Sequence, residues 1–330
     1  KAFNIIASGA SYNNTNEINA LGSSSLASDV SVFNMSYGTN TLGASLLPLK
    51  SSSVMSQIES GATTLRSGKG ASYVNSVGND YNKGATGSSN FSYCGGGSNA
   101  GTLKISCYDT IFDKIFYSAY LIGVGALNAD GTKASYSTAG SSTWVSSYGG
   151  EGGYNTAYGV SGATNTSPAI TAADRSSCAK GYNSSVSSEG LKNGVRANAF
   201  NDYASPHSEN QSCNYTNLMN GTSSAAPIVS GVIALMLETN STLTARDVKH
   251  ILATTAVQVD ASFSATAINS INYVGWITNG SGLKFHPWYG FGSVDATAAV
   301  NAAASYTAGS LGTQSFTSWN NSSSGSVNLQ

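Results

Sequence analysis

The sequence of 330 residues carries little charge of either sign. Asp, Glu, Lys and Arg together make up 9% of the residues, and the formal net charge at pH 7 is -1. There is no basic cluster of the kind that binds nucleic-acid phosphates, so we expect no nucleic-acid partner. The chain is nevertheless 40% apolar, with aromatic residues spread along it, which excludes a disordered chain. Its length is sufficient for one large α/β domain.

Cysteine, histidine and long apolar runs are also scarce. No stretch of 18 apolar residues occurs, so we expect no membrane span. The four cysteines lie in polar loops, Cys94 near Cys107 and Cys178 near Cys213, which predicts two local disulfides. Their spacing does not match a Cys/His zinc site. Low charge with abundant Ser, Thr, Asn and Gly predicts a secreted protein, extracellular or periplasmic.

Segments of strand and helix type alternate through the first 130 residues. Short buried strands are predicted over residues 2–8, 30–38, 71–79 and 118–127, and helices over residues 13–27 and 46–69. This alternation predicts an α/β fold with a parallel sheet covered by helices on both faces. Ligands bind at the carboxyl ends of such strands. Because Lys1 leads directly into a strand and no signal peptide is recognisable, we expect the native chain to begin upstream.

The rest of the chain is less regular. A polar insertion covers residues 80–117, a turn is predicted at 128–131, a short strand at 134–137, and little regular structure between 144 and 215. Two helices are predicted over residues 243–256, with Thr244 as the N-cap, and over 296–304. We expect one domain over residues 1–304, followed by a linker or the truncated start of a β-rich domain over 305–330.

The most informative stretch is residues 220–238, a Gly-Thr-Ser turn followed by an apolar helix rich in small residues. Such a turn places the Ser223 hydroxyl at a helix N-terminus, where the dipole and free N–H groups favour developing negative charge. This arrangement suits a nucleophilic serine whose reaction passes through an oxyanion. The simpler alternative is that Thr222 or Ser223 only caps a buried helix.

The longer motif Gly-Thr-Ser-x-Ala-x-Pro, beginning at Gly221, resembles the nucleophile motif of the subtilisin-like serine proteases. Two further motifs follow that family's order, an Asn-x-Ser-x-Gly segment ending at Gly38 and a Gly-Asn pair ending at Asn79. The resemblance covers residues 1–304. It implies a three-layer α/β fold, with the N-terminal third missing from this chain, and a serine endopeptidase that hydrolyses peptide bonds through a serine acyl-enzyme.

The resemblance also implies roles for individual residues. Ser223 is expected to be the nucleophile, and the side-chain amide of Asn79 to donate into the oxyanion hole. The alternative for Asn79 is an ordinary turn asparagine. An exposed strand edge is expected to pair with the backbone of a peptide or protein substrate. The expected substrate-binding residues are Ser36, Tyr37, Gly38, Val77, Gly78 and Thr222.

The motifs over residues 243–248 and 289–296 lean toward the kexin-like branch of the family, in which a β-rich P domain follows the catalytic domain. The family's catalytic Asp and His precede the first strand of this chain, and His207, His250 and His286 do not occupy the place of the base. We therefore expect a separate N-terminal fragment of the same precursor to supply both residues. The alternatives are an inactive protease-like binding or scaffold domain and an esterase-like hydrolase.

Specificity and metal binding depend on scattered carboxylates. Kexin-like enzymes hold a basic P1 side chain with acidic groups, and Asp109 and Asp113 are the candidates here, the alternative being solvated loop charges. No cofactor is required for the chemistry, although structural calcium is common in the family. The loop carboxylates that could bind it are Asp80, Asp109, Asp113 and Asp174, without a clustered ligand pattern. The family ties a cysteine at the position of Cys213 to the missing part, so the disulfide pairing stays open.

Overall fold

The computed structural model describes residue 1 and residues 13–38, 51–81, 109–110, 113–151, 168–182, 191–192, 195–196, 199–202, 204–263, 266–268, 271–273 and 275–312. The predicted strand over residues 2–8, the start of the helix predicted from residue 46, Cys94, Cys107 and most of the insertion lie outside these residues.

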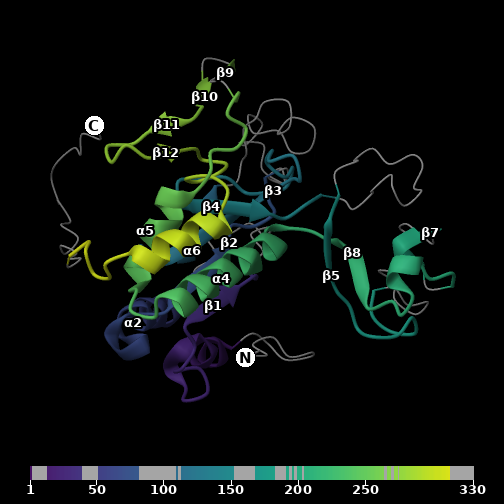
Figure 1. Ribbon diagram of the computed structural model, residues 1–330, viewed down its shortest axis with the longest axis horizontal. Coiled ribbons are helices and arrows are strands. Elements are labelled where there is room, and N and C mark those ends of the chain that lie inside the picture. The colour runs from purple at the N-terminus through teal and green to yellow at the C-terminus, as the bar shows by residue number, and fades with distance from the viewer. Residues whose placement is uncertain are drawn as a thin grey trace.

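Four parallel strands form the main sheet, in the order β1-β2-β3-β4 (Figure 1). Their bounds are Val32–Met35, Ser72–Ser76, Leu121–Leu127 and Thr143–Tyr148. Every residue of β2 and β3 is buried, as expected for parallel strands covered on both faces. The predicted α/β fold with a parallel sheet is therefore confirmed.

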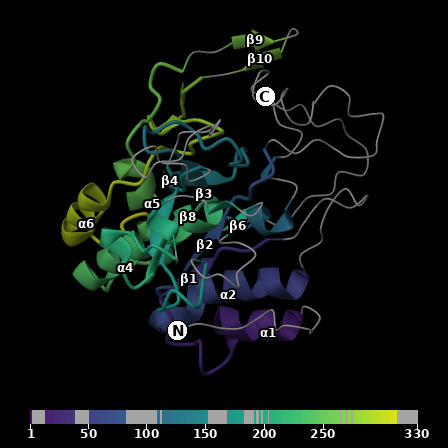
Figure 2. The same cartoon turned by 90° about the vertical axis from the view of Figure 1, so that its right-hand side faces the viewer.

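Helices cover both faces of this sheet and make three layers (Figures 1 and 2). Helices α4, α5 and α6 pack with Val74 and Ile122 in one core, whereas α2 packs with Phe33 and Tyr73 in another. Tyr73 and Val74 are neighbours in β2, and because successive side chains of a strand point to opposite faces, each of them packs in a different core. The helices are α1 Asn14–Ile18, continued by the π-turn η1 Asn19–Ser23, α2 Ser52–Gly68, α4 Thr222–Thr239, α5 Ala245–Thr255 and α6 Ala296–Ser305.

Local sequence signals account for several of these helix ends. The Thr244 hydroxyl caps α5 by accepting from the Asp247 backbone N–H, and the Asp247 carboxylate accepts from the Thr244 backbone N–H. This capping box confirms the predicted N-cap. Beyond α6, residues 306–312 remain attached to α5, since Asp247 also accepts from the Gly309 backbone at 2.9 Å.

Two predictions about local structure are wrong. Residues 134–137 form a turn instead of a short strand, because the hydroxyl of Tyr136 is used inside the protein by neighbouring backbone groups. The region from residue 144 contains β4, which was not predicted. Ser146 and Ser147 are buried within it, so its sequence lacks the hydrophobic pattern that normally identifies a buried strand.

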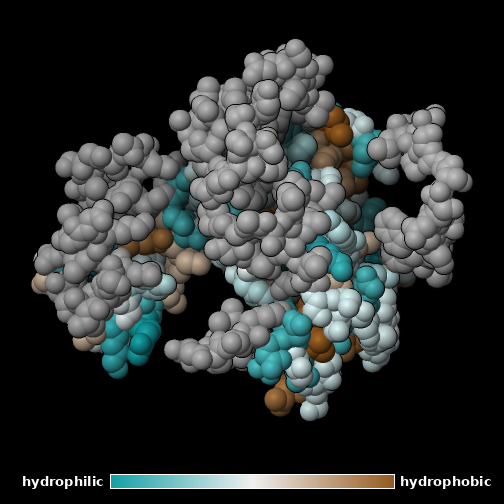
Figure 3. Space-filling model, turned by 180° about the vertical axis from the view of Figure 1, so that it is seen from behind, coloured by the Kyte–Doolittle hydropathy of each residue, from teal (hydrophilic) through white to brown (hydrophobic). Residues whose placement is uncertain are grey.

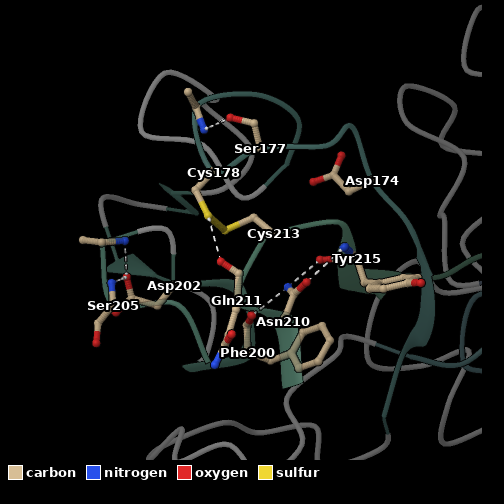
Figure 4. Close-up of a disulfide and its surroundings, with 12 residues drawn as sticks. Asp174, Ser177, Cys178, Phe200, Asp202, Ser205, Asn210, Gln211, Cys213 and Tyr215 are labelled. Atoms are coloured by element: carbon tan, nitrogen blue, oxygen red, sulfur yellow. Dashed lines mark hydrogen bonds between the residues drawn. A yellow bond between two sulfur atoms is a disulfide. The ribbon is translucent and has the colours of Figure 1, made fainter. Parts of the chain in front are cut away.

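An arm projects from the core between β4 and α4 (Figure 1). Its antiparallel strands β5 and β8 span Ile170–Ala173 and Tyr215–Met219, and β8 is followed along the chain by the Gly-Thr-Ser turn at residues 221–223. The disulfide Cys178–Cys213 closes the arm (Figure 4), confirming that local pairing. The smaller elements are β6 Leu191–Lys192, β7 Val195–Arg196, η4 Lys114–Tyr117, η6 Ala199–Asn201, η7 Ser208–Asn210, β9 Thr266–Ile268, β10 Ile271–Tyr273, β11 Ile277–Thr278 and β12 Lys284–Phe285.

Only α4, among the described residues, is long and apolar enough to cross a membrane by length and composition. Half of it is buried, and it contributes Val229, Ile233 and Met236 to the core against the sheet. Packing against the sheet therefore accounts for the apolar residues on its buried half. On the face opposite Figure 1, apolar residues form separate patches among polar ones (Figure 3).

Candidate active site

Helix α4 begins at the predicted nucleophile turn. Gly221 is the N-cap residue, with φ 105°, and no side chain caps the helix, so the alternative of a Thr or Ser cap is wrong. A positive φ of this size is accessible to glycine at little cost. Ser223 lies half-buried in the first turn of α4. The backbone N–H groups of a first turn have no partner within the helix, and the helix dipole there favours negative charge.

Asn79, at the end of β2, is held against this turn. Its Oδ1 accepts hydrogen bonds from the backbone N–H of Thr222 at 2.9 Å and from the Thr222 hydroxyl at 3.0 Å. The Thr222 hydroxyl in turn accepts from the Gly78 backbone N–H at 3.2 Å. These bonds use the oxygen of the Asn79 side chain and leave its amide nitrogen, a neutral hydrogen-bond donor, outside them.

The end of β1 is tied to Ser223 by a pair of reciprocal contacts. The Ser36 hydroxyl donates to the Ser223 carbonyl at 2.9 Å, and the Ser223 hydroxyl donates to the Ser36 carbonyl at 3.4 Å. The Ser223 carbonyl can accept this bond because its partner within the helix would be the N–H of residue 227. That residue is Pro227, which has no N–H to donate. Pro227 thus leaves the Ser223 carbonyl of α4 available, and Ser36 at the end of β1 donates a hydrogen bond to it.

Strand ends that are far apart in sequence thus converge as predicted. Ser36, Gly78, Asn79, Thr222 and Ser223 are joined by the hydrogen bonds above. Val77, which was also predicted to bind substrate, is 4% exposed, and its N–H is used by the Val124 carbonyl of β3 at 3.1 Å. Its backbone N–H is therefore used within the sheet, and a role of Val77 in substrate binding stays a prediction.

Two carboxylates, those of Asp113 and Glu17, lie next to residues 36–38. A Cβ built on Gly38 would be 3.9 Å from Oδ2 of Asp113, whose Oδ1 caps η4 by accepting from the Ile115 N–H at 3.1 Å. The Tyr37 hydroxyl donates to the buried carboxylate of Glu17 at 2.8 Å, and burial raises the pKa of that tyrosine. Sequence reasoning missed Glu17, the one buried residue of α1, because an acidic residue in a short polar helix is normally solvent-exposed.

The second acidic candidate for the specificity pocket has a different position. Asp109 packs against Gly140, where a built Cβ would be 2.3 Å from its Oδ1, and accepts from the Thr110 hydroxyl at 3.4 Å. Of the two candidates, Asp113 is the one that reaches Gly38.

None of the three histidines hydrogen-bonds to Ser223. His207 lies in the arm, where its Nδ1 accepts from the Glu209 N–H, and His250 lies on α5. His286 is fully buried, with Nδ1 accepting from the Trp288 N–H at 3.0 Å. Burial lowers its pKa to about 4, against a smaller opposing effect of Asp260. That the base lies outside this chain stays a prediction.

Metal binding has no focus in the described part of the chain, where no group of three or more His, Cys, Asp or Glu residues is placed to share an ion. Asp174 uses its carboxylate to close a loop, accepting from the N–H groups of Arg175 and Tyr182, both at 2.7 Å (Figure 4 shows its place beside the disulfide). Structural calcium remains a prediction.

Comparisons with known proteins agree with this geometry. The model of the "Subtilase family" of peptidases matches residues 3–292. The extracellular serine protease of Aeromonas sobria is 30% identical over 308 residues, covering 89% of this chain and 44% of that protein. Human proprotein convertase subtilisin/kexin type 6 is 46% identical, but only over 76 residues, which are 23% of this chain and 7% of that protein.

A solved structure resembles this fold over most of the chain. The crystal structure of the Aeromonas sobria serine protease matches with a TM-score of 0.71 and 29% identity, covering 93% of this chain and 49% of that one. The same protease has also been solved in complex with a chaperone, with the same TM-score. The chain thus spans less than half the length of these Aeromonas sobria relatives.

Proposed function

The chain belongs to the subtilase family, and we propose that it is the catalytic part of a secreted serine endopeptidase. The observation that supports this most strongly is the hydrogen-bonded assembly of Ser36, Asn79 and Ser223 at one edge of the sheet. Three segments of the sequence meet there at the N-terminus of α4, where an oxyanion would be stabilised. Secretion is supported by the extracellular relative and by the disulfide in the arm.

The chemistry assigned to these residues is acyl transfer. The Ser223 hydroxyl attacks the carbonyl carbon of the peptide bond while a histidine from outside the described residues takes its proton. The Asn79 amide nitrogen and the Ser223 backbone N–H donate to the oxyanion. The histidine then protonates the leaving amine, and water releases the acyl group by the reverse sequence. No cofactor takes part in these steps.

We assign the supply of that histidine to an N-terminal fragment of the same precursor, bound without a covalent link. The outward face of α4 supports this assignment because it is apolar where a surface helix is normally charged: Ile228 is 37% exposed and Leu235 is 55% exposed. Between them, a Cβ built on Gly231 meets no atom within 4 Å, so another helix could approach closely. This face begins one turn beyond Ser223, which places its occupant beside the nucleophile.

The proposed substrate is a peptide with a basic P1 side chain, as in the kexin-like branch. The support is the Asp113 carboxylate at Gly38, on the strand edge expected to bind the substrate backbone. The short but high-identity match to a proprotein convertase points the same way.

Two measurements test the fragment and the activity together. Intact-mass analysis of the purified protein should identify a co-purifying fragment that contains Asp and His. Replacing Leu235 with Glu should reduce both the amount of bound fragment and the peptidase activity, since it places a charge in the apolar face. The matched control is Leu26→Glu, at a residue 70% exposed in the turn that follows η1, which should change neither. Full activity in Leu235→Glu would exclude α4 as the docking face.

A further inference from the structure

The hydroxyl of Tyr136 lies where three segments of the chain meet. It accepts a hydrogen bond from the Gly221 backbone N–H at 2.8 Å. It donates to the backbone carbonyls of Gly150 at 2.5 Å and Gly149 at 3.1 Å. Burial raises the pKa of Tyr136, so its proton is retained and one oxygen can accept from the nucleophile turn and donate to the end of β4.

Neighbouring groups from the same segments hold this turn at Asn220. The Asn220 amide donates to the backbone carbonyl of Glu151 at 2.6 Å. The Glu151 carboxylate accepts from the backbone and the hydroxyl of Ser135, the residue before Tyr136. The turn at residues 220–221 is therefore hydrogen-bonded to residues 135–136 and 149–151 at two points, the side chain of Asn220 and the backbone of Gly221.

The fit between these segments is tight. A Cβ built on Gly149 would be 2.8 Å from the Gly221 carbonyl oxygen and 3.1 Å from the Tyr136 hydroxyl. The Gly221 carbonyl begins α4 by accepting from the Ser224 N–H at 3.0 Å. Whatever fixes the Gly221 peptide therefore also fixes the first turn of α4, which carries Ser223.

We propose that Tyr136 is a positioning residue that holds the Asn220–Gly221 turn and, through it, Ser223 and the N–H groups that would face the oxyanion. Its catalytic consequence rests on the proposed function, but the holding of the turn does not. Gly221 has a conformation with φ 105° and no side chain to anchor it, so the hydrogen bond to Tyr136 supplies the restraint.

Asn220 followed by glycine provides a chemical reporter of that restraint. In an unrestrained Asn-Gly pair, the glycine nitrogen loses its proton and attacks the asparagine side-chain carbon, forming a succinimide and releasing ammonia. Water then opens the ring to aspartate or isoaspartate. Here the Gly221 N–H is bound to Tyr136 and the Asn220 amide is bound to Glu151, so both reacting groups are held. Loss of the Tyr136 hydroxyl should therefore speed deamidation at Asn220, with or without enzymatic activity.

The experiment compares Tyr136→Phe with the control Tyr182→Phe, an exposed tyrosine of the arm, in the complete protein. Deamidation at Asn220 is followed by peptide mass spectrometry at mildly alkaline pH, and kcat and KM are measured on a peptide substrate. Tyr136→Phe should deamidate several times faster than wild type and lose about fivefold to tenfold in kcat at unchanged KM, as expected for one hydrogen bond. Tyr182→Phe should match wild type.

The outcomes separate this proposal from the proposed function. Faster deamidation in a protein without peptidase activity would support the holding of the turn and refute the catalytic assignment. Deamidation at the wild-type rate would overturn the proposal, whatever the activity. A raised KM with unchanged kcat would also overturn it, because Tyr136 would then contact substrate directly. A thermal unfolding midpoint for each variant ensures that the rates are compared between folded proteins.

Discussion

Replacement of Asp113 by Asn tests the proposed preference for a basic P1 side chain. Two functions of Asp113 bear on this test: Oδ1 caps η4 through the Ile115 N–H at 3.1 Å, and Oδ2 faces Gly38. Asparagine caps helices about as well as aspartate, so Asp113→Asn keeps the first function and removes only the charge of the second. The variant is therefore expected to fold normally.

The expected loss follows from the kind of contact that is removed. A hydrogen bond to a charged group contributes about 1.5–3 kcal/mol, which corresponds to about a 10- to 150-fold change in kcat/KM. The assay compares peptides that differ only at P1, with arginine in one and norleucine in the other. Asp113→Asn should lose this factor on the arginine peptide and stay within about threefold of wild type on the norleucine peptide.

Asp109→Asn is the matched control for this prediction, since Asp109 is a nearby carboxylate that packs against Gly140 instead of Gly38. It should leave the ratio of the two substrates unchanged. Equal losses on both peptides in Asp113→Asn would show a structural role and refute the reasoning, as would a wild-type enzyme that does not prefer arginine.

Further predictions concern the oxyanion donor, a buried histidine and the arm. Asn79→Ala should lower kcat by about 10²–10³, the loss measured for the equivalent kind of donor in subtilisin, with little change in KM; a raised KM at constant kcat would contradict the assignment. Burial lowers the pKa of His286 to about 4, so the unfolded chain binds a proton first as pH falls below about 6.5, and stability should decrease between pH 6.5 and 4. The decrease is at most about 3 kcal/mol, and His286→Phe should reduce it in denaturant titrations at each pH; an identical pH dependence in the variant would exclude His286 as the cause. Removing the Cys178–Cys213 disulfide, which spans 35 residues, should destabilise the arm by about 3–4 kcal/mol and expose it to limited proteolysis, while cleavage within α4 and the main sheet should not increase.

The sequence predicted those parts of the fold that depend on local or periodic signals. The buried strand β3 is a continuous apolar run, and α5 begins at a threonine with an acidic residue three positions later. The rule that parallel strands end at one edge of a sheet predicted that Ser36 and Asn79 lie on the same side, and the family resemblance placed Ser223 beside them. These inferences require only the order of elements along the chain.

Other features depend on tertiary contacts that no local pattern reveals. β4 was missed because Ser146 and Ser147 are buried by their neighbours and not by their own hydrophobicity. Residues 134–137 alternate like a strand, but Tyr136 uses its hydroxyl for the nucleophile turn. Sequence reasoning offered Asp109 and Asp113 equally, and only the three-dimensional structure distinguishes the one that reaches Gly38.

The most direct test of the central claim is covalent labelling of the complete protein with a fluorophosphonate, followed by peptide mapping. This reagent reacts with a serine that is activated by a base and stabilised at an oxyanion hole. A single adduct is expected, on Ser223, that is absent from Ser223→Ala and strongly reduced in Asn79→Ala. No adduct, or an adduct on another serine with Ser223 unmodified, would contradict the assignment of Ser223 as the nucleophile.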